Sequence, residues 1–125
     1  MIYFDQVTKH YRDGTPALEN VTLSVSPKEF VSIVGHSGAG KTTLLKMLLA
    51  EEKPSAGNVF FEEVDIHDLP KNALHHYRRK IGTVFQDFRL IPTKTAYENI
   101  AFAMEAVGSR DDEIATFPTS STSWT

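Results

Sequence analysis

Polar and apolar residues largely alternate near the start of the chain, and this alternation predicts two strands. The first covers Ile2–Val7 and the second Ala17–Val25, with a turn between them that contains Asp13, Gly14 and Pro16. Because successive side chains of a strand point to opposite faces, apolar residues at every second position lie on one face. The apolar residues of the second strand are Leu18, Val21, Leu23 and Val25.

Two further runs are apolar with few polar interruptions. Phe30–Val34 is nearly continuous in apolar residues, as expected for a strand that is covered on both faces in a parallel sheet. Ile81–Phe85 predicts another short strand, and Asn58–Glu62 a third. Strands interleaved with helical segments predict an α/β fold.

The first predicted helix follows the Phe30–Val34 run after a short loop and extends from about Lys41 to about Ala50. Leucines recur in it at helical spacing and predict one buried stripe. This stripe consists of Leu44, Leu45, Leu48 and Leu49.

Two more helices are predicted further along the chain. One begins at Leu69 with Asp68 as its cap, buries Leu74 and Tyr77, and ends in the basic triplet 78–80, which we interpret as a solvated helix end. The other begins at a capping box and ends at a glycine. These boundary residues are Thr95, Glu98 and Gly108.

The composition changes near the end of the chain. Residues 111–113 resemble the acidic start of another helix that does not continue, and residues 115–125 are rich in Ser and Thr without periodicity. We therefore expect one domain portion over residues 1–114 and a disordered, unrelated tail over residues 115–125.

Composition excludes several classes of protein. The chain has 125 residues, a formal net charge of −3 and no cysteine, so it offers no basic nucleic-acid footprint, no disulfide and no cysteine metal site. No signal peptide and no apolar run long enough to span a bilayer are visible. We expect a cytosolic protein, unless a partner holds it at a membrane.

The segment Gly35–Thr42 fits the pattern G-x-x-x-x-G-K-[ST] between a predicted strand and a predicted helix, which is the context this motif needs. Its glycines let successive N–H groups turn toward phosphate oxygens, and the helix N-terminus adds to the anion site. Lys41 would reach the β- and γ-phosphates, and the Thr42 hydroxyl would bind Mg²⁺. The predicted ATP contacts are Gly35, His36, Ser37, Gly38, Ala39, Gly40, Lys41, Thr42 and Thr43.

The order of motifs resembles the N-terminal half of an ATP-binding-cassette (ABC) ATPase. Tyr11 is similar to that family's adenine-stacking aromatic residue, Gly35–Thr42 to its Walker A loop, and Gln86 to its Q-loop glutamine. The resemblance implies that Gln86 contacts Mg²⁺ and the attacking water, so that Lys41 and Gln86 are the catalytic candidates. Without the resemblance, Tyr11 could be a core tyrosine and Gln86 an ordinary loop residue.

Within the family, the segments 49–54, 85–92 and 95–105 resemble the cell-division branch. The implied fold is the N-terminal part of a P-loop NTPase of the ABC type, with antiparallel strands, helices and part of the parallel RecA-like sheet. The branch implies a homodimer on the inner face of the cell membrane, bound to an integral membrane subunit. That subunit would contact Phe88, Arg89 and Leu90.

The family's signature motif, Walker B strand and switch histidine are not present in this sequence. Without the Walker B carboxylates the attacking water has no general base, so we expect weak Mg-ATP binding and no turnover. Our hypothesis is a truncated or frameshifted gene product. Sequencing the surrounding DNA tests it, because an intact frame that ends naturally at Thr125 would contradict it.

Other functions fit parts of the sequence. An ATPase of a lipoprotein-release or macrolide-type exporter resembles the same motifs. A small P-loop GTPase or kinase would need an Asn-Lys-x-Asp motif or an arginine-bearing lid, and neither is visible. A non-catalytic fragment that binds the membrane subunit through Phe88–Pro92 is the third alternative.

Overall fold

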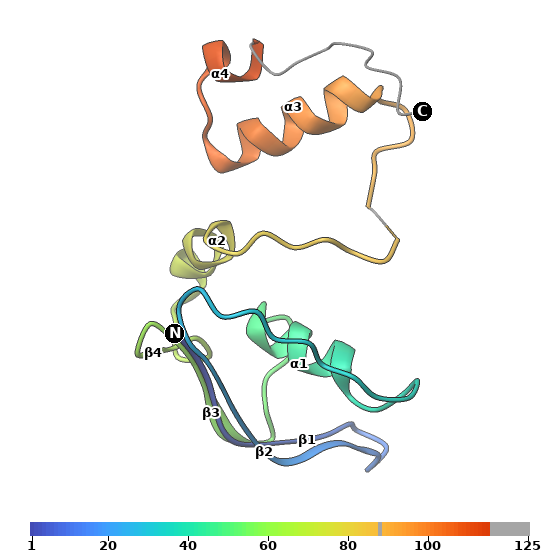
Figure 1. Ribbon diagram of the computed structural model, residues 1–125, viewed down its shortest axis with the longest axis vertical. Helices are drawn as coiled ribbons and strands as arrows, with labels where there is room; N and C mark the ends of the chain where they lie inside the picture. Colours follow the sequence, from blue (N-terminus) through green and yellow to red (C-terminus); the bar gives the residue numbers. More distant parts are fainter. Residues whose placement is uncertain (88, 116–125) are drawn as a thin grey trace. The chain divides into compact units, whose positions relative to one another are not determined.

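The computed structural model describes residues 1–87 and 89–115. The chain divides into two compact units, Met1–Ile81 and Gly82–Thr125, and each is described here by itself (Figure 1). Within the described residues, no helix has the length and apolar content that crossing a bilayer requires.

The first unit contains a four-stranded antiparallel sheet in the order β2-β1-β3-β4. Its strands are β1 (Ile2–His10), β2 (Pro16–Val25), β3 (Ala56–Phe61) and β4 (Val64–Asp65). β1 and β2 are joined by the predicted turn, in which the Tyr11 N–H donates to the Thr15 carbonyl at 3.0 Å. The alternating segments therefore form strands as predicted, and β3 begins slightly earlier than expected.

Helix α1 (Lys41–Leu48) packs beside the sheet (Figure 1). Leu44 and Met47 share its buried face because three residues make almost one helical turn, whereas Leu45 is 54% exposed. The predicted stripe is therefore wrong at Leu45, and Met47, which the leucine pattern missed, is completely buried. The core cluster consists of Phe4, Val7, Leu18, Leu44, Met47, Val59, Ile66 and Tyr77.

Helix α2 (Lys71–Arg79) has Pro70 as its N-cap residue, with no side-chain cap. The prediction of Asp68 as the cap is wrong, because the helix begins later than the sequence suggested. Asp68 stands two residues before the cap position, whereas a capping side chain bonds the N–H groups just inside the helix. Tyr77 is buried as predicted, and Leu74 is half-buried.

Residues at the end of α2 cap the C-terminal end of α1. The Tyr77 hydroxyl donates to the Leu48 carbonyl, and burial raises the pKa of this hydroxyl to about 12, so it stays protonated. Arg78 donates from Nε to the Leu49 carbonyl at 2.8 Å and from Nη2 to the Ala50 carbonyl at 3.0 Å. Arg78 is therefore a capping residue and not part of a merely solvated helix end.

Two predicted strands are not formed. The Phe30–Val34 and Ile81–Phe85 segments belong to no strand, and Phe30, Val34 and Val84 are more than 90% exposed. A strand of a parallel sheet obtains its hydrogen bonds from neighbouring strands. Within the described residues, no strand pairs with either segment, so their apolar composition does not lead to burial.

The second unit contains α3 (Ala96–Val107) and the short α4 (Asp111–Ala115). The predicted capping box is present, with the Glu98 N–H donating to Thr95 Oγ1 at 3.2 Å and the Thr95 N–H donating to Glu98 Oε2 at 2.7 Å. Gly108 ends α3 in the left-handed conformation, as predicted.

The acidic segment after α3 does form a helix, contrary to expectation, because the side chain of Ile114 is buried and stabilises this single short turn. Ala115, the first residue of the predicted tail, belongs to α4, and the rest of that tail, residues 116–125, lies outside the described residues.

We expect Arg78→Ala to lower the free energy of unfolding by about 1–2 kcal/mol, because two α1 carbonyls lose their charged donor. Chemical denaturation of the purified chain measures the change. Arg79→Ala is the control, since Arg79 is exposed on the same helix. Equal stability of the two variants would show that the cap contributes nothing.

Candidate nucleotide-binding site

The loop Gly35–Thr42 leads directly into α1, which begins at Lys41. Its residues are exposed up to Ala39, and Gly40 is buried at the point where the helix begins. The Ala39 N–H donates to the His36 carbonyl at 3.2 Å, which turns the backbone back on itself. The loop is therefore a compact turn on the surface with a buried end.

Gly40 is required by its conformation and by its surroundings. Its φ of 83° lies in the left-handed region, and it is the N-cap residue of α1 without any side-chain cap. A Cβ atom at this position would lie 2.5 Å from the Ala17 carbonyl oxygen and 2.6 Å from Leu18 Cδ2. The loop and β2 thus approach each other so closely that only glycine fits between them.

The backbone of this loop presents a set of N–H groups without acceptors. Within the described first unit, no acceptor bonds the N–H groups of Gly38, Gly40, Lys41, Thr42 and Thr43. The first N–H groups of a helix carry the positive end of its dipole. Because the groups stand in one short segment and no acidic residue lies in the first turn of α1, the segment suits a bound anion.

Lys41 places its ammonium group over the same loop. Nζ donates to the carbonyl oxygens of Gly35 and His36, each at 2.6 Å. His36 Nδ1 lies 2.7 Å from the Ser37 carbonyl oxygen, so the exposed loop side chains also bond within the loop. A phosphate in the loop would meet both the free N–H groups and the lysine charge.

The side chain of Tyr11 lies beside the first turn of α1. Its hydroxyl lies 3.2 Å from Thr43 Oγ1 and forms a hydrogen bond with it, although the two residues are far apart in the sequence. Tyr11 is 37% exposed and is not a member of the core cluster. The structure therefore brings together the aromatic residue and the loop that the sequence predicted.

The donor set also fits a magnesium nucleotide. Thr42 is exposed at the end of the loop, where its hydroxyl can supply one oxygen ligand. Within the described residues, no group of three or more His, Asp or Glu side chains gathers as metal ligands. Mg²⁺ usually keeps several waters and binds through substrate phosphates, so one hydroxyl beside a phosphate loop is a suitable arrangement.

Gln86 belongs to the second unit, where it is exposed in a turn. Its predicted contact with Mg²⁺ and water stays a prediction. Beside it, the Arg89 guanidinium lies 3.7 Å from the centroid of the Phe85 ring and pairs with Asp87 at 3.8 Å. Phe88 lies outside the described residues.

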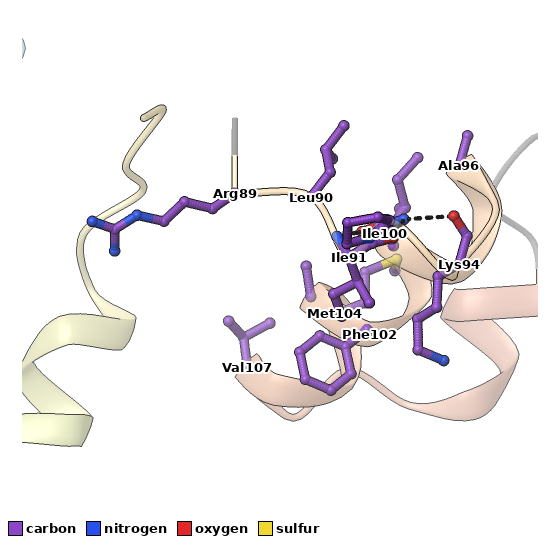
Figure 2. A pocket seen from close by; sticks show the side chains of 12 residues that line it. Arg89, Leu90, Ile91, Lys94, Ala96, Ile100, Phe102, Met104 and Val107 are labelled. Carbon is purple, nitrogen blue, oxygen red and sulfur yellow. Dashed lines mark hydrogen bonds between the residues drawn. The ribbon is translucent and has the colours of Figure 1, made fainter. Parts of the chain in front are cut away.

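An apolar groove of about 900 Å³ runs along α3 in the second unit (Figure 2). No residue of α3 is buried within the described structure, and Leu90, Phe102 and Val107 are each more than half exposed. The sequence pattern of α3 indicated only helical spacing, which is equally typical of a core face. The apolar lining residues are Leu90, Ile91, Pro92, Ala96, Ile100, Phe102, Ala103, Met104 and Val107.

Asn99 lines this groove and shapes it, although no motif in the sequence pointed to this residue. Its Oδ1 accepts from the Ile91 N–H at 2.7 Å, and its Nδ2 donates to the carbonyls of Ile91, Lys94 and Thr95 at 3.3, 3.1 and 2.9 Å. The loop before α3 is therefore fastened to the helix by one side chain. In the sequence, the one indication of this role is that Asn99 directly follows the capping box of Thr95 and Glu98.

Comparison with known proteins places these features in a family. The model of the ABC transporter family matches residues 18–122. The cell division ATP-binding protein FtsE of Bacillus subtilis (strain 168) is 43% identical over 114 residues, which are 91% of this chain and 50% of the relative. The FtsE protein of Escherichia coli (strain K12) is 42% identical over 114 residues, with 91% of this chain and 51% of the relative covered.

Solved structures give the same result. A bacterial ABC transporter cassette solved as a dimer matches with a TM-score of 0.82 and 40% identity, over 91% of this chain and 52% of that one. A post-hydrolysis state of the same cassette, bound to ADP and Pi, matches with a TM-score of 0.81 and 39% identity, over the same shares of the two chains. This chain thus spans about half the length of the curated relatives it matches.

We expect Gly40→Ala to lower the free energy of unfolding by more than about 2 kcal/mol, because backbone strain and a clash with β2 add together. Gly38 also has a positive φ, but a Cβ atom added there would meet no neighbouring atom. Gly38→Ala should therefore lower the free energy of unfolding by only about 1 kcal/mol. Denaturant unfolding of both variants tests this order. Gly82→Ala is the control, because Gly82 has no positive φ and an added Cβ atom would meet no neighbour. If the Gly40→Ala chain is as stable as this control, the close approach of Gly40 to β2 is contradicted.

Proposed function

The chain belongs to the ABC transporter family, and on that premise we propose that it binds Mg-ATP in the loop Gly35–Thr42. The observation that supports this most is the set of N–H groups without acceptors at Gly38 and at residues 40–43, with the Lys41 ammonium over the same loop. A nucleoside triphosphate supplies the several negative oxygens that such a donor set can satisfy.

Each predicted residue has one task in this proposal. The N–H groups and Lys41 bind the phosphates, with Gly35, His36, Ser37 and Ala39 forming the wall of the loop. Thr42 contributes an oxygen to Mg²⁺, and the exposed part of the Tyr11 ring stacks against the base. Gln86 orients the attacking water in the complete site.

We further propose that this chain binds ATP without hydrolysing it. Hydrolysis needs a carboxylate or equivalent base that positions water at the γ-phosphate. Among the described carboxylates of the first unit, none forms a hydrogen bond or an ion pair with Gly35–Thr43. Within the described first unit, the residues proposed to hold phosphate therefore have no carboxylate bonded to them.

Its biological setting follows from the relatives named FtsE. We propose that the chain is the ATP-binding part of a complex in bacterial cell division, on the inner face of the cell membrane, and that the complete cassette acts as a dimer. The proposed partner is an integral membrane subunit resembling FtsX.

The groove along α3 is the proposed docking site for that subunit. Its lining is largely apolar and exposed, with Arg89 and Lys94 as the charged lining residues (Figure 2). An amphipathic helix with apolar residues on one face and acidic residues beside them would complement this surface. Arg89 and Leu90, which the sequence analysis assigned to the partner contact, both line it.

We expect excess Mg-ATP to stabilise the purified chain by about 2.7 kcal/mol at 100 times the dissociation constant, because ATP binds only the folded loop. Thermal unfolding with and without Mg-ATP measures this shift. Lys41→Ala should abolish it, whereas Lys46→Ala on the same helix should keep it. A shift that survives Lys41→Ala would contradict nucleotide binding in this loop.

Release of inorganic phosphate provides a second readout on the same samples. The unmodified chain should release phosphate no faster than the Lys41→Ala variant does. A higher rate that disappears on Lys41→Ala would refute the absence of hydrolysis while leaving ATP binding intact.

For the groove, we expect Phe102→Ala to weaken association with the FtsX-like subunit about fivefold to tenfold, because an aromatic side chain is lost from the apolar lining. Co-purification of the two proteins in detergent, with quantified recovery, measures the effect. Val64→Ala is the control, since Val64 is similarly exposed but belongs to the first unit. Equal recovery of both variants would exclude this groove as the docking site.

A further inference from the structure

We propose that Thr43 is a positioning residue, and that its hydrogen bond to Tyr11 fixes the aromatic ring for base recognition. The inference rests on the proposed binding of ATP, and it concerns how the loop distinguishes a nucleotide from a bare polyphosphate. It assigns a function to the 3.2 Å contact between the two hydroxyls, which phosphate binding alone leaves unexplained.

The Thr43 side chain is held where it can act on Tyr11. Thr43 is 6% exposed and lies in the first turn of α1, beside the free N–H groups. Within the described first unit, its hydroxyl has one hydrogen bond, and the partner is Tyr11. A threonine hydroxyl in a helix often bonds a backbone carbonyl of the preceding turn. The Thr43 hydroxyl instead bonds a side chain outside the helix.

Tyr11 is restrained from three directions. Its backbone is fixed by the turn, in which its N–H donates to Thr15 at 3.0 Å and its carbonyl accepts from Gly14 at 2.9 Å. Its ring lies beneath Lys9, whose Nζ is 5.6 Å from the centroid. The bond from its hydroxyl to Thr43 fixes the remaining side-chain torsions.

The lysine over the ring is itself anchored. Lys9 Nζ lies 2.9 Å from Glu52 Oε2 and donates to the Lys53 carbonyl at 2.7 Å, and its side chain is only 12% exposed. Both contacts are to the segment that follows α1. The Tyr11 ring is thus held at the start of α1 by Thr43. Lys9, which lies over this ring, is held by the segment that follows the end of the same helix.

A ring that is already oriented loses little freedom when a base stacks on it. Immobilising a free side chain lowers affinity by about threefold to tenfold, and the Tyr11–Thr43 bond removes this loss in advance. Because Thr43 belongs to the phosphate-binding turn, the bond also fixes the separation between base and phosphates. Base recognition should therefore depend on it, and phosphate recognition should not.

Tyr11→Phe in the full chain tests the inference, because it removes the hydroxyl and keeps the ring. Titrations with Mg-ATP and with magnesium tripolyphosphate, which has no base, are compared. We expect Tyr11→Phe to weaken ATP binding about threefold to tenfold and to leave tripolyphosphate binding unchanged. Tyr3→Phe, which removes a hydroxyl bonded to Asp5 in β1, is the matched control and should change neither affinity.

Variants of Thr43 complete a double-mutant cycle. Thr43→Val should weaken ATP binding, Thr43→Ser should restore it because a hydroxyl is present again, and Tyr11→Phe should add nothing to Thr43→Val. Circular dichroism of each variant confirms that it is folded.

The outcomes separate this inference from the proposed function. If Tyr11→Phe binds ATP as well as the unmodified chain does, or weakens tripolyphosphate binding equally, the positioning role is refuted and ATP binding stands. If the folded, unmodified chain binds neither ligand, the proposed function fails and this inference fails with it.

Discussion

The close approach of the loop backbone to β2 at Gly40 is the constraint on which the rest of the first unit depends. A glycine in the left-handed conformation lets the chain pass against the Ala17 carbonyl and enter α1 at once. A Cβ atom here would clash with Ala17 and Leu18, so the start of α1, which carries Leu44 into the core, would have to shift relative to β2. Because the N–H groups without acceptors belong to the same few residues, packing and the proposed phosphate binding share one backbone geometry.

Contacts at both ends of α1 preserve this geometry. At the start of the helix, the Tyr11 hydroxyl bonds Thr43 of the first turn, and at its end Tyr77 and Arg78 of α2 cap the last carbonyls. A short helix has few hydrogen bonds of its own, so bonds from neighbouring elements contribute much of its stability. The start of α1, where the candidate site lies, therefore depends on residues outside the loop.

Some elements of the fold were predicted correctly from the sequence and others were not. The alternation of β1 and β2, the loop and its helix, and the Thr95–Glu98 capping box are local patterns, and each is confirmed. The strands expected at 30–34 and 81–85 were wrong because burial of a parallel strand depends on partners, which composition does not specify. Asp68 and Leu45 were misassigned because a shift of one or two residues changes a helix cap or its buried face.

The chemistry of the candidate site was predictable from local sequence, since a glycine-rich loop followed by Lys41, Thr42 and a helix is typical of phosphate binding. The strand expected before this loop is not formed. The sequence also determined the family, through motifs whose order is specific. Three contacts become visible only in the folded chain: the Tyr11 hydroxyl bonds Thr43, Arg78 caps α1, and Asn99 bonds the loop before α3. These contacts depend on side-chain directions and on which elements become neighbours, and those are set by packing of the whole unit rather than by local pattern.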